Sequence, residues 1–295
     1  MESMDWKLPK ATALIERALV EDRATEDVTT LASIDPALMA EASILAKQSC
    51  VLAGFGLVER VFEVFAQLDP AVIGKPLVQL HDSLQDGSRL EAGQVVATIR
   101  HQARVVLSCE RVILNLLQHL SGIATETRRY VDELAGTKAV LLDTRKTIPG
   151  LRRMEKYAVA CGGGTNHRLD LADGILVKNN HIDLGGGVAA VCGKLLARRK
   201  GGLKLEVEVR NMDELEAALA NGAEAILLDN MTPGQTRMAV ARARQHPAYI
   251  PLESSGGITI GNIRQYAECG VDFISVGALT HSSPAVDLSM RIRPA

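Results

Sequence analysis

Apolar residues recur at two different spacings in the first hundred positions of the chain. Helical spacing runs through residues 11–20 and 54–65, whereas residues 40–46 alternate more like a strand. Residues 86–99 place glycines between short apolar pairs, which predicts short strands linked by turns. The first third of the chain is therefore expected to mix helices with antiparallel strands.

One long segment, residues 103–120, is apolar almost all round, which predicts a helix that is buried on most of its surface. Its exception is a polar stripe on one helical face, formed by Arg111, Asn115, Gln118 and His119. Such a stripe faces either a wet cavity or a partner chain. For Arg111, an ordinary structural ion pair is an equally good interpretation.

The pattern changes near residue 139 to short apolar runs separated by helices. The runs occupy residues 139–142, 175–177, 205–209, 225–228, 249–252 and 273–276. Helix signals lie between them, such as Asn211 before one helix and Gly270 after another. Short apolar strands that alternate with helices predict parallel βα units. About six strands are clear, fewer than the eight of a complete α/β barrel, so an incomplete barrel is expected.

Composition narrows the kind of protein. The 33 basic and 35 acidic residues nearly cancel and aromatic residues make up 3%, which argues against a nucleic-acid-binding protein. No apolar run approaches the roughly 20 residues of a membrane-spanning helix, and residues 1–6 lack the features of a signal peptide. The five cysteines are scattered without paired spacing, as reduced thiols are. We therefore expect a cytoplasmic protein with neither a nucleic acid nor a membrane as its partner.

Polar residues recur where each predicted strand ends, which is where an α/β barrel carries its active site. They are residues 143–146, Lys178, Glu208, Asp229 with Asn230, residues 253–257, and Gly277 with Ala278. A site built from several strand ends is therefore predicted.

Cations concentrate between residues 143 and 181, although the chain as a whole is slightly acidic. The candidates are Arg145, His167, Arg168 and Lys178. The planar fork of arginine binds carboxylates in a bidentate manner, which lysine does not. Any one of these residues alone is as well explained by an exposed surface position. Together, beside glycine turns, they indicate a site for a small ligand with several negative charges.

The late strand ends carry a second signal. Ser255-Gly256-Gly257 and Gly277-Ala278 let backbone N–H groups approach a phosphate closely, and a helix predicted from Thr259 adds its dipole. Plain turn glycines are the alternative interpretation.

Glu208 and Asp229 lie one βα unit apart, so both can reach the mouth of the barrel. Paired carboxylates in that place hold sugar hydroxyls, support Mg²⁺, or serve as acid and base. Salt bridges to Lys146 or Lys178 are an equally good interpretation. Glu206 has the same parity on its strand as Glu208, so side-chain alternation does not distinguish the two.

Ten short motifs fall in these segments. They are DTRKT at 143–147, PGLR at 149–152, EKYAV at 155–159, GGG at 162–164, NHR at 166–168, NH at 180–181, EVEV at 206–209, LDN at 228–230, ESSGGI at 253–258 and ISVGALTHS at 274–282. Their combination closely resembles the quinolinate phosphoribosyltransferases, also called carboxylating nicotinate-nucleotide pyrophosphorylases. The resemblance extends over nearly the whole chain.

The resemblance implies a fold and a reaction. The implied fold is an N-terminal α/β open-faced sandwich, residues 1–120 joined by the tail 284–295, followed by an incomplete α/β barrel at 121–283. The implied reaction transfers the phosphoribosyl group of phosphoribosyl pyrophosphate to quinolinate with decarboxylation. Its products are nicotinate mononucleotide for de novo NAD biosynthesis, carbon dioxide and pyrophosphate. Mg²⁺ accompanies the phosphoribosyl pyrophosphate, and no organic cofactor is implied.

The same resemblance implies a role for each candidate residue. The quinolinate ligands are Arg111, Arg145, His167, Arg168 and Lys178. The phosphoribosyl pyrophosphate ligands are Thr144, Lys146, Glu208, Asp229, Ser255, Gly256, Gly257, Val276, Gly277 and Ala278. The catalytic electrostatics come from Lys146, Lys178, Glu208 and Asp229. Glu208 and Asp229 also hold Mg²⁺, directly or through the substrate. Arg111 would be supplied across the interface of a homodimer, and a larger assembly is also compatible.

Three positions depart from the usual pattern of the family. Glu26 and Asp170 stand where glycine is common, and Asn179 stands where an acid is common. None of them removes an implied ligand.

Three other kinds of protein are alternatives. A molybdenum-transport-associated protein of the same fold is disfavoured by the intact DTRKT and NHR motifs. A nicotinate-using phosphoribosyltransferase would need fewer cations for its single carboxylate. A non-catalytic sugar-phosphate-binding barrel would be expected to lack Glu208, Asp229 or the cations, and this chain has all of them.

Overall fold

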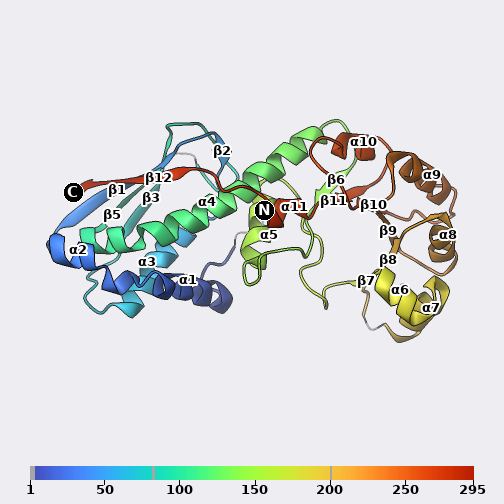
Figure 1. Cartoon of the computed structure of the whole chain (residues 1–295), viewed down its shortest axis with the longest axis horizontal. Helices are drawn as coiled ribbons and strands as arrows, with labels where there is room; N and C mark the ends of the chain where they lie inside the picture. Colours follow the sequence, from blue (N-terminus) through green and yellow to red (C-terminus); the bar gives the residue numbers. More distant parts are fainter. Residues whose placement is uncertain (1–3, 82–83, 200) are drawn as a thin grey trace. The chain divides into compact units, whose positions relative to one another are not determined.

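The computed structural model describes residues 4–81, 84–199 and 201–295, which form two compact units (Figure 1). The first unit takes the chain up to Glu126 together with residues 149–163 and 283–295, and the second takes residues 127–148 and 164–282. The chain therefore enters the second unit, returns to the first for one segment, and then completes the second. The domain bounds expected from the sequence, residues 1–120 with the tail 284–295 and residues 121–283, stay a prediction, and they do not include this return of residues 149–163 to the first unit.

The first unit combines helices with a four-stranded antiparallel sheet in the order β12-β1-β5-β3. Its elements are α1 (Pro9–Glu21), the 3₁₀ helix η1 (Ala24–Glu26), α2 (Val28–Ser33), β1 (Met39–Ala46), β2 (Cys50–Val51), α3 (Leu57–Leu68), β3 (Leu77–Leu80), β4 (Arg89–Leu90), β5 (Val95–Gln102), most of α4 (Ala103–Glu133), α5 (Arg152–Cys161) and β12 (Leu288–Pro294). Alternate residues of β1 are fully buried, among them Ile44, which pairs with Ala97 and Met290. The C-terminal strand thus completes the sheet of the N-terminal part, and the expected mixture of helices and antiparallel strands is confirmed.

The second unit is built on six parallel strands in the order β6-β11-β10-β9-β8-β7. Its elements are the end of α4, β6 (Val140–Leu142), β7 (Ile175–Val177), α6 (Asn179–Gly185), α7 (Val188–Arg198), β8 (Leu205–Val209), α8 (Met212–Ala220), β9 (Ala225–Asp229), α9 (Pro233–Ala243), β10 (Leu252–Ser255), α10 (Ile263–Ala267), β11 (Phe273–Ser275) and α11 (Ala278–His281). Figure 1 shows the strands along an arc with helices α7 to α10 outside it. The predicted incomplete barrel of six strands is confirmed.

The sheet stays open between β6 and β7, which follow one another in the chain but lie at its two edges. At the β6 edge, Thr165 forms a parallel bridge with Leu142. The Thr165 N–H donates to the Leu141 carbonyl at 2.9 Å, and the Asp143 N–H donates to the Thr165 carbonyl at 3.2 Å. The segment that leads into His167 therefore lies along the free edge of the sheet, where a closed barrel would have a further strand.

One strand lies later than the sequence predicts. The apolar run at 249–252 was expected to be the strand, but β10 covers Leu252–Ser255. Pro251 has no N–H to donate to a neighbouring strand, so pairing with β9 and β11 begins at Leu252. As a result, Glu253 is a buried strand residue and does not belong to a loop.

The described part of the chain contains no helix that is both long and apolar enough to cross a membrane. The five cysteines are all free and buried.

Candidate active site

A cavity of about 460 Å³ lies at the carboxyl ends of the strands of the second unit, where α/β barrels carry their sites. Its lining residues are Thr144, Arg145, Lys146, His167, Arg168, Leu176, Lys178, Glu208, Leu227, Asp229, Asn230, Glu253, Ser255, Gly256, Gly257 and Ser275. All of them belong to the second unit. Residues that are far apart in the sequence therefore meet around one small space.

Most of the predicted site residues line this cavity. They are Thr144, Arg145, Lys146, His167, Arg168, Lys178, Glu208, Asp229, Ser255, Gly256 and Gly257. Four predicted residues are not among its lining: Val276 is buried, Gly277 and Ala278 begin α11, and Arg111 is exposed on α4 in the first unit. The roles implied for these four stay predictions.

Sequence reasoning gave no role to five residues that line the cavity: the apolar Leu176 and Leu227 and the polar Asn230, Glu253 and Ser275. A signal for two of them was present, because Asn230 and Glu253 stand among the polar residues at the predicted strand ends. Ser275 lies inside the last apolar run, and nothing in its local pattern marks it.

Two guanidinium groups in the lining of the cavity, those of Arg145 and Arg168, lie close enough to affect one another. Burial and then the neighbouring Arg145 lower the pKa of Arg168 from its usual value. Nη1 of Arg168 donates to the Gly174 carbonyl at 2.9 Å, which fixes the direction of its side chain. Like charges held together in a partly buried place favour an anionic ligand that relieves their repulsion.

The cavity is also lined by carboxylates that hold hydrogen-bond donors. Nζ of Lys178 lies 2.9 Å from Oε2 of Glu208. Asp229 accepts hydrogen bonds from the side-chain amides of Asn179 at 3.2 Å and Asn230 at 2.9 Å. The salt bridge considered from the sequence is therefore present. It leaves both partners on the cavity surface.

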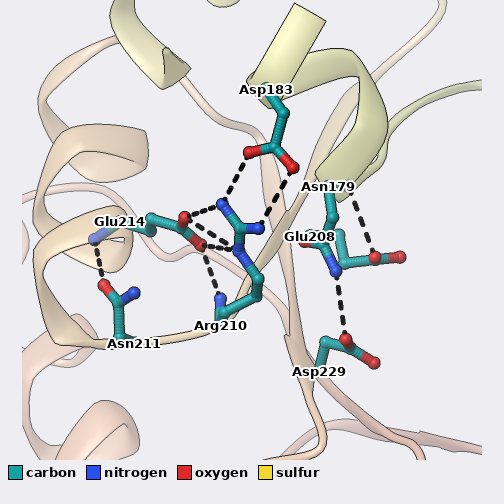
Figure 2. A network of polar contacts seen from close by, with 7 residues as sticks. All are labelled: Asn179, Asp183, Glu208, Arg210, Asn211, Glu214 and Asp229. Carbon is teal, nitrogen blue, oxygen red and sulfur yellow. Dashed lines mark hydrogen bonds and ion pairs between the residues drawn. The ribbon is translucent and has the colours of Figure 1, made fainter.

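Asn179 lies between the two carboxylates (Figure 2). Its backbone N–H points to Oε1 of Glu208 at 3.5 Å while its side chain donates to Asp229. An acid at this position would add a third negative charge beside these two, whereas the amide supplies a donor. The departure at Asn179 thus lowers the negative charge of this wall.

A second network holds the helix that carries Asn179. Figure 2 shows Arg210, just after β8, between Asp183 of α6 and Glu214 of α8. Both contacts are 3.0 Å long, from Nη2 to Asp183 and from Nε to Glu214. At the start of α6, the Lys178 N–H donates to Nδ1 of His181 at 2.9 Å. These contacts fix α6 and, through it, the position of Lys178 and Asn179.

His167 is surrounded by protein acids. Its Nε2 lies 3.3 Å from Oε2 of Glu253 and 3.5 Å from Oε2 of Glu206, and its backbone N–H donates to Asp143 at 2.8 Å. Burial opposes a charge on the ring, but the two neighbouring glutamates outweigh it and raise the pKa of His167 to about 10. Glu206 and Glu208 both point inward from β8, as their shared parity predicts.

The loop after β10 has a strained backbone suited to close approach. Gly256 has φ +91° and Gly257 has φ +63°, and a Cβ on Gly256 would lie 2.3 Å from Oδ1 of Asn230. Asn230 itself has φ +54°, and its N–H donates to the Ser255 carbonyl at 2.8 Å. Only glycine fits at position 256, so the backbone there can come near a bound phosphate.

Gly277, the residue before α11, lies against the side chains of Lys146 and His281. A Cβ on Gly277 would lie 2.9 Å from Cδ of Lys146 and 3.2 Å from Nε2 of His281. Oγ1 of Thr280 donates to the Lys146 carbonyl at 2.8 Å. In this structure, the start of α11 packs against Lys146 and supports it.

These features define a class of protein. In a parallel α/β barrel, cations, paired carboxylates and a glycine loop line the same cavity. That arrangement is the one expected of a transferase that brings a phosphorylated sugar to an anionic acceptor.

Comparison with known proteins identifies the family. The quinolinate phosphoribosyl transferase N-terminal domain matches residues 27–121, and the C-terminal domain of the same family matches residues 123–291. The chain belongs to the quinolinate phosphoribosyltransferase family. It is 41% identical to the carboxylating nicotinate-nucleotide pyrophosphorylase of Mycobacterium leprae, covering 97% of this chain and 98% of the relative. For the probable enzyme of that name from Bacillus subtilis, identity is 40%, covering 95% of this chain and 92% of the relative.

A solved structure supports the same family and fold. The crystal structure of NadC from Streptococcus pyogenes matches with a TM-score of 0.90 and 37% identity, over 99% of this chain and 100% of that one. Membership and fold therefore rest on sequence and structure together.

Proposed function

We propose that quinolinate and phosphoribosyl pyrophosphate bind side by side in the cavity of the second unit. The observation that supports this most directly is that cations, carboxylates and a glycine loop line one and the same cavity. The reaction is phosphoribosyl transfer to quinolinate with decarboxylation, which gives nicotinate mononucleotide in NAD biosynthesis.

The cations of the cavity are assigned to quinolinate. Arg145, Arg168 and Lys178 would pair with its two carboxylates, with His167 forming part of the wall. Leu176 also lines the cavity and offers an apolar surface to the pyridine ring. Holding the ring in place beside the sugar is mainly a positioning effect.

The carboxylates and the glycine loop of the cavity are assigned to phosphoribosyl pyrophosphate. The loop of Ser255, Gly256 and Gly257 would hold the 5′-phosphate, and Lys146 would lie near the pyrophosphate. When the pyridine nitrogen attacks the anomeric carbon and pyrophosphate leaves, positive charge develops on the sugar. Glu208 and Asp229 would stabilise that charge. The positively charged pyridinium nitrogen then stabilises the carbanion that forms on the adjacent ring carbon as its carboxylate departs as carbon dioxide, and this carbon takes up a proton from solvent to give nicotinate mononucleotide.

The same carboxylates suit Mg²⁺. Glu208 and Asp229 offer the hard oxygen ligands that this ion prefers, and both line the cavity. Mg²⁺ that arrives with phosphoribosyl pyrophosphate would neutralise part of its negative charge.

One assay tests the assignment of substrates. We expect nicotinate mononucleotide to form from quinolinate, phosphoribosyl pyrophosphate and Mg²⁺. With nicotinate as acceptor, kcat/KM should be lower by about 100-fold or more, because a cation is left without its carboxylate. Equal turnover of nicotinate would instead support the single-carboxylate alternative.

We also propose a homodimer in which Arg111 completes the partner's site. Arg111 is exposed on α4, and its side chain is thus available to a second copy.

Arg111→Ala and Arg168→Ala should each be inactive alone. Mixed after unfolding and refolding together, they should regain about a quarter of wild-type activity, because random pairing leaves one intact site in half of the dimers. No recovery in mixed dimers, confirmed as dimers by mass, would contradict a shared site.

A further inference from the structure

Two lysines line the cavity, and the protein holds them in different ways. Nζ of Lys178 lies 2.9 Å from Oε2 of Glu208. Lys146 is exposed, and its ammonium group makes no ion pair with any residue in the described part of the chain. The charge of Lys146 is therefore available to an anion, and its position must be set by contacts along its stem and its backbone.

The backbone of Lys146 is held by two threonine hydroxyl groups. Its N–H donates to Oγ1 of Thr144 at 3.0 Å, and its carbonyl accepts a hydrogen bond from Oγ1 of Thr280 at 2.8 Å. Thr144 is a near neighbour in the chain, whereas Thr280 lies 134 positions later, in α11. The second contact therefore joins the loop after β6 to the helix that follows the neighbouring strand β11.

The Thr280 hydroxyl has two acceptors within reach. One is the Gly277 carbonyl at 3.3 Å, three residues back, which is a common acceptor for a helical threonine. That carbonyl already accepts the backbone N–H groups of Thr280 at 3.2 Å and His281 at 3.3 Å. The Lys146 carbonyl is closer, and among the residues that the structure describes no other group donates to it. The Lys146 carbonyl is thus the acceptor that depends on this hydroxyl.

The start of α11 also supports the stem of Lys146. A Cβ on Gly277 would lie 2.9 Å from Cδ of Lys146, so the stem lies directly against bare backbone. Thr280 itself is 1% exposed, and water therefore does not replace its hydroxyl as a donor. Backbone and stem are held from the same helix, while the ammonium group is left free.

We propose that Thr280 is a positioning residue for Lys146, and through Lys146 for the pyrophosphate group of phosphoribosyl pyrophosphate. Thr280 does not line the cavity, so it acts on the substrate through Lys146. A lysine side chain loses rotamer freedom when its ammonium group is held by a ligand, and a backbone and stem that are already fixed reduce this loss. The inference rests on the proposed function, which places Lys146 near the pyrophosphate.

Substitutions at position 280 test the role of the hydroxyl. Thr280→Val removes it and keeps the shape of the side chain. The KM for phosphoribosyl pyrophosphate should rise by about 10-fold, because the Lys146 carbonyl loses its donor. The KM for quinolinate should stay within about twofold of wild type, a difference between substrates that general damage to the fold would not produce. Thr280→Ser restores the hydroxyl and should return the first KM to within about threefold of wild type.

Two further measurements connect the effect to Lys146. Inorganic pyrophosphate should bind Thr280→Val about 10-fold more weakly than wild type in calorimetry with Mg²⁺ present. In a Lys146→Ala background, Thr280→Val should cause no further rise in the KM for phosphoribosyl pyrophosphate, because one residue acts through the other.

Thr236→Val is the matched control. Thr236 is also fully buried, in α9 of the same unit, and its hydroxyl makes no hydrogen bond within the described residues. This variant should keep wild-type kinetics.

The possible results separate clearly. A wild-type KM for phosphoribosyl pyrophosphate in folded Thr280→Val would overturn the proposal, as would Thr280→Ser that is equally impaired or effects that add fully in the double variant. If thermal unfolding shows that Thr280→Val does not fold, Thr280→Ala removes the same hydroxyl without a methyl group against the Lys146 carbonyl and is judged by the same results. A wild-type KM in Lys146→Ala would contradict the placement of Lys146 itself. Absence of nicotinate mononucleotide with the wild-type protein would instead overturn the proposed function as a whole.

Discussion

Arg168→Ala is expected to reduce quinolinate turnover to background. Removing one partner of a desolvated charge pair costs about 3–5 kcal/mol, which corresponds to a loss of about 150- to 5,000-fold in kcat/KM. Arg168 is partly buried beside Arg145, and its side chain is already oriented by Gly174. The substrate carboxylate would therefore lose a guanidinium group that is already oriented for binding, and water would be a poor substitute for that group.

The kinetic signature distinguishes this effect from general damage. The loss should appear in the dependence on quinolinate, while the KM for phosphoribosyl pyrophosphate changes little. Arg168→Lys keeps the charge without the fork and should fall between wild type and alanine. Arg17→Ala, on the exposed side of α1, should have wild-type kinetics. Activity of Arg168→Ala within tenfold of wild type would remove Arg168 from the proposed quinolinate site.

Gly256→Ala should have the second large effect. A methyl group at this position would lie 2.3 Å from Oδ1 of Asn230, and the backbone has φ +91°. Either the loop or the Asn230 side chain, which donates to Asp229, must shift, and a displacement of about 1 Å near the chemistry lowers the rate by about 100-fold. We expect that loss in kcat/KM for phosphoribosyl pyrophosphate, measured at saturating quinolinate.

Gly93→Ala separates backbone strain from the collision. Gly93 has φ +88°, almost the same as Gly256, but a Cβ there meets nothing within 4 Å. Gly93 belongs to the first unit and does not line the cavity. Its substitution should destabilise the protein by about 1–2 kcal/mol without a kinetic change. A Gly256→Ala variant with an unchanged KM for phosphoribosyl pyrophosphate would show that this loop does not hold the phosphate.

The sequence predicted the strands of the barrel well because each is a short apolar run between helix signals. It predicted the lining cations for a related reason: Arg145, Lys146, His167 and Arg168 lie close together in the chain and beside one sheet edge. Physical proximity followed sequence proximity there. Glu208 and Asp229 were found because strand ends of parallel sheets meet at one edge.

Glu253 shows what such reasoning missed. An apolar run ending at Leu252 made the next residue look like a loop, but β10 starts at Leu252 and runs through Glu253. A buried acid inside a strand is explained by its partners, here His167, and these partners come from distant parts of the sequence. Hydrophobic patterning along one segment has no means of predicting a partner that comes from a distant segment.

Local sequence patterns also did not predict that residues 149–163 return to the first unit. Nothing in the helical periodicity of that segment says which unit its apolar face will contact. Only the packing of the folded chain assigns α5 to the unit of β1 and β12.

The open edge of the sheet has a consequence for how new specificities could arise. The connection between β6 and β7 carries Arg145, Lys146, His167 and Arg168, whereas Glu208, Asp229 and the Gly256 loop follow other strands. Under the proposed assignment, most of the acceptor recognition is encoded in one contiguous stretch, and nearly all of the donor recognition is encoded elsewhere. A different acid could be accepted by altering that stretch alone, with the machinery for the activated sugar left as it is.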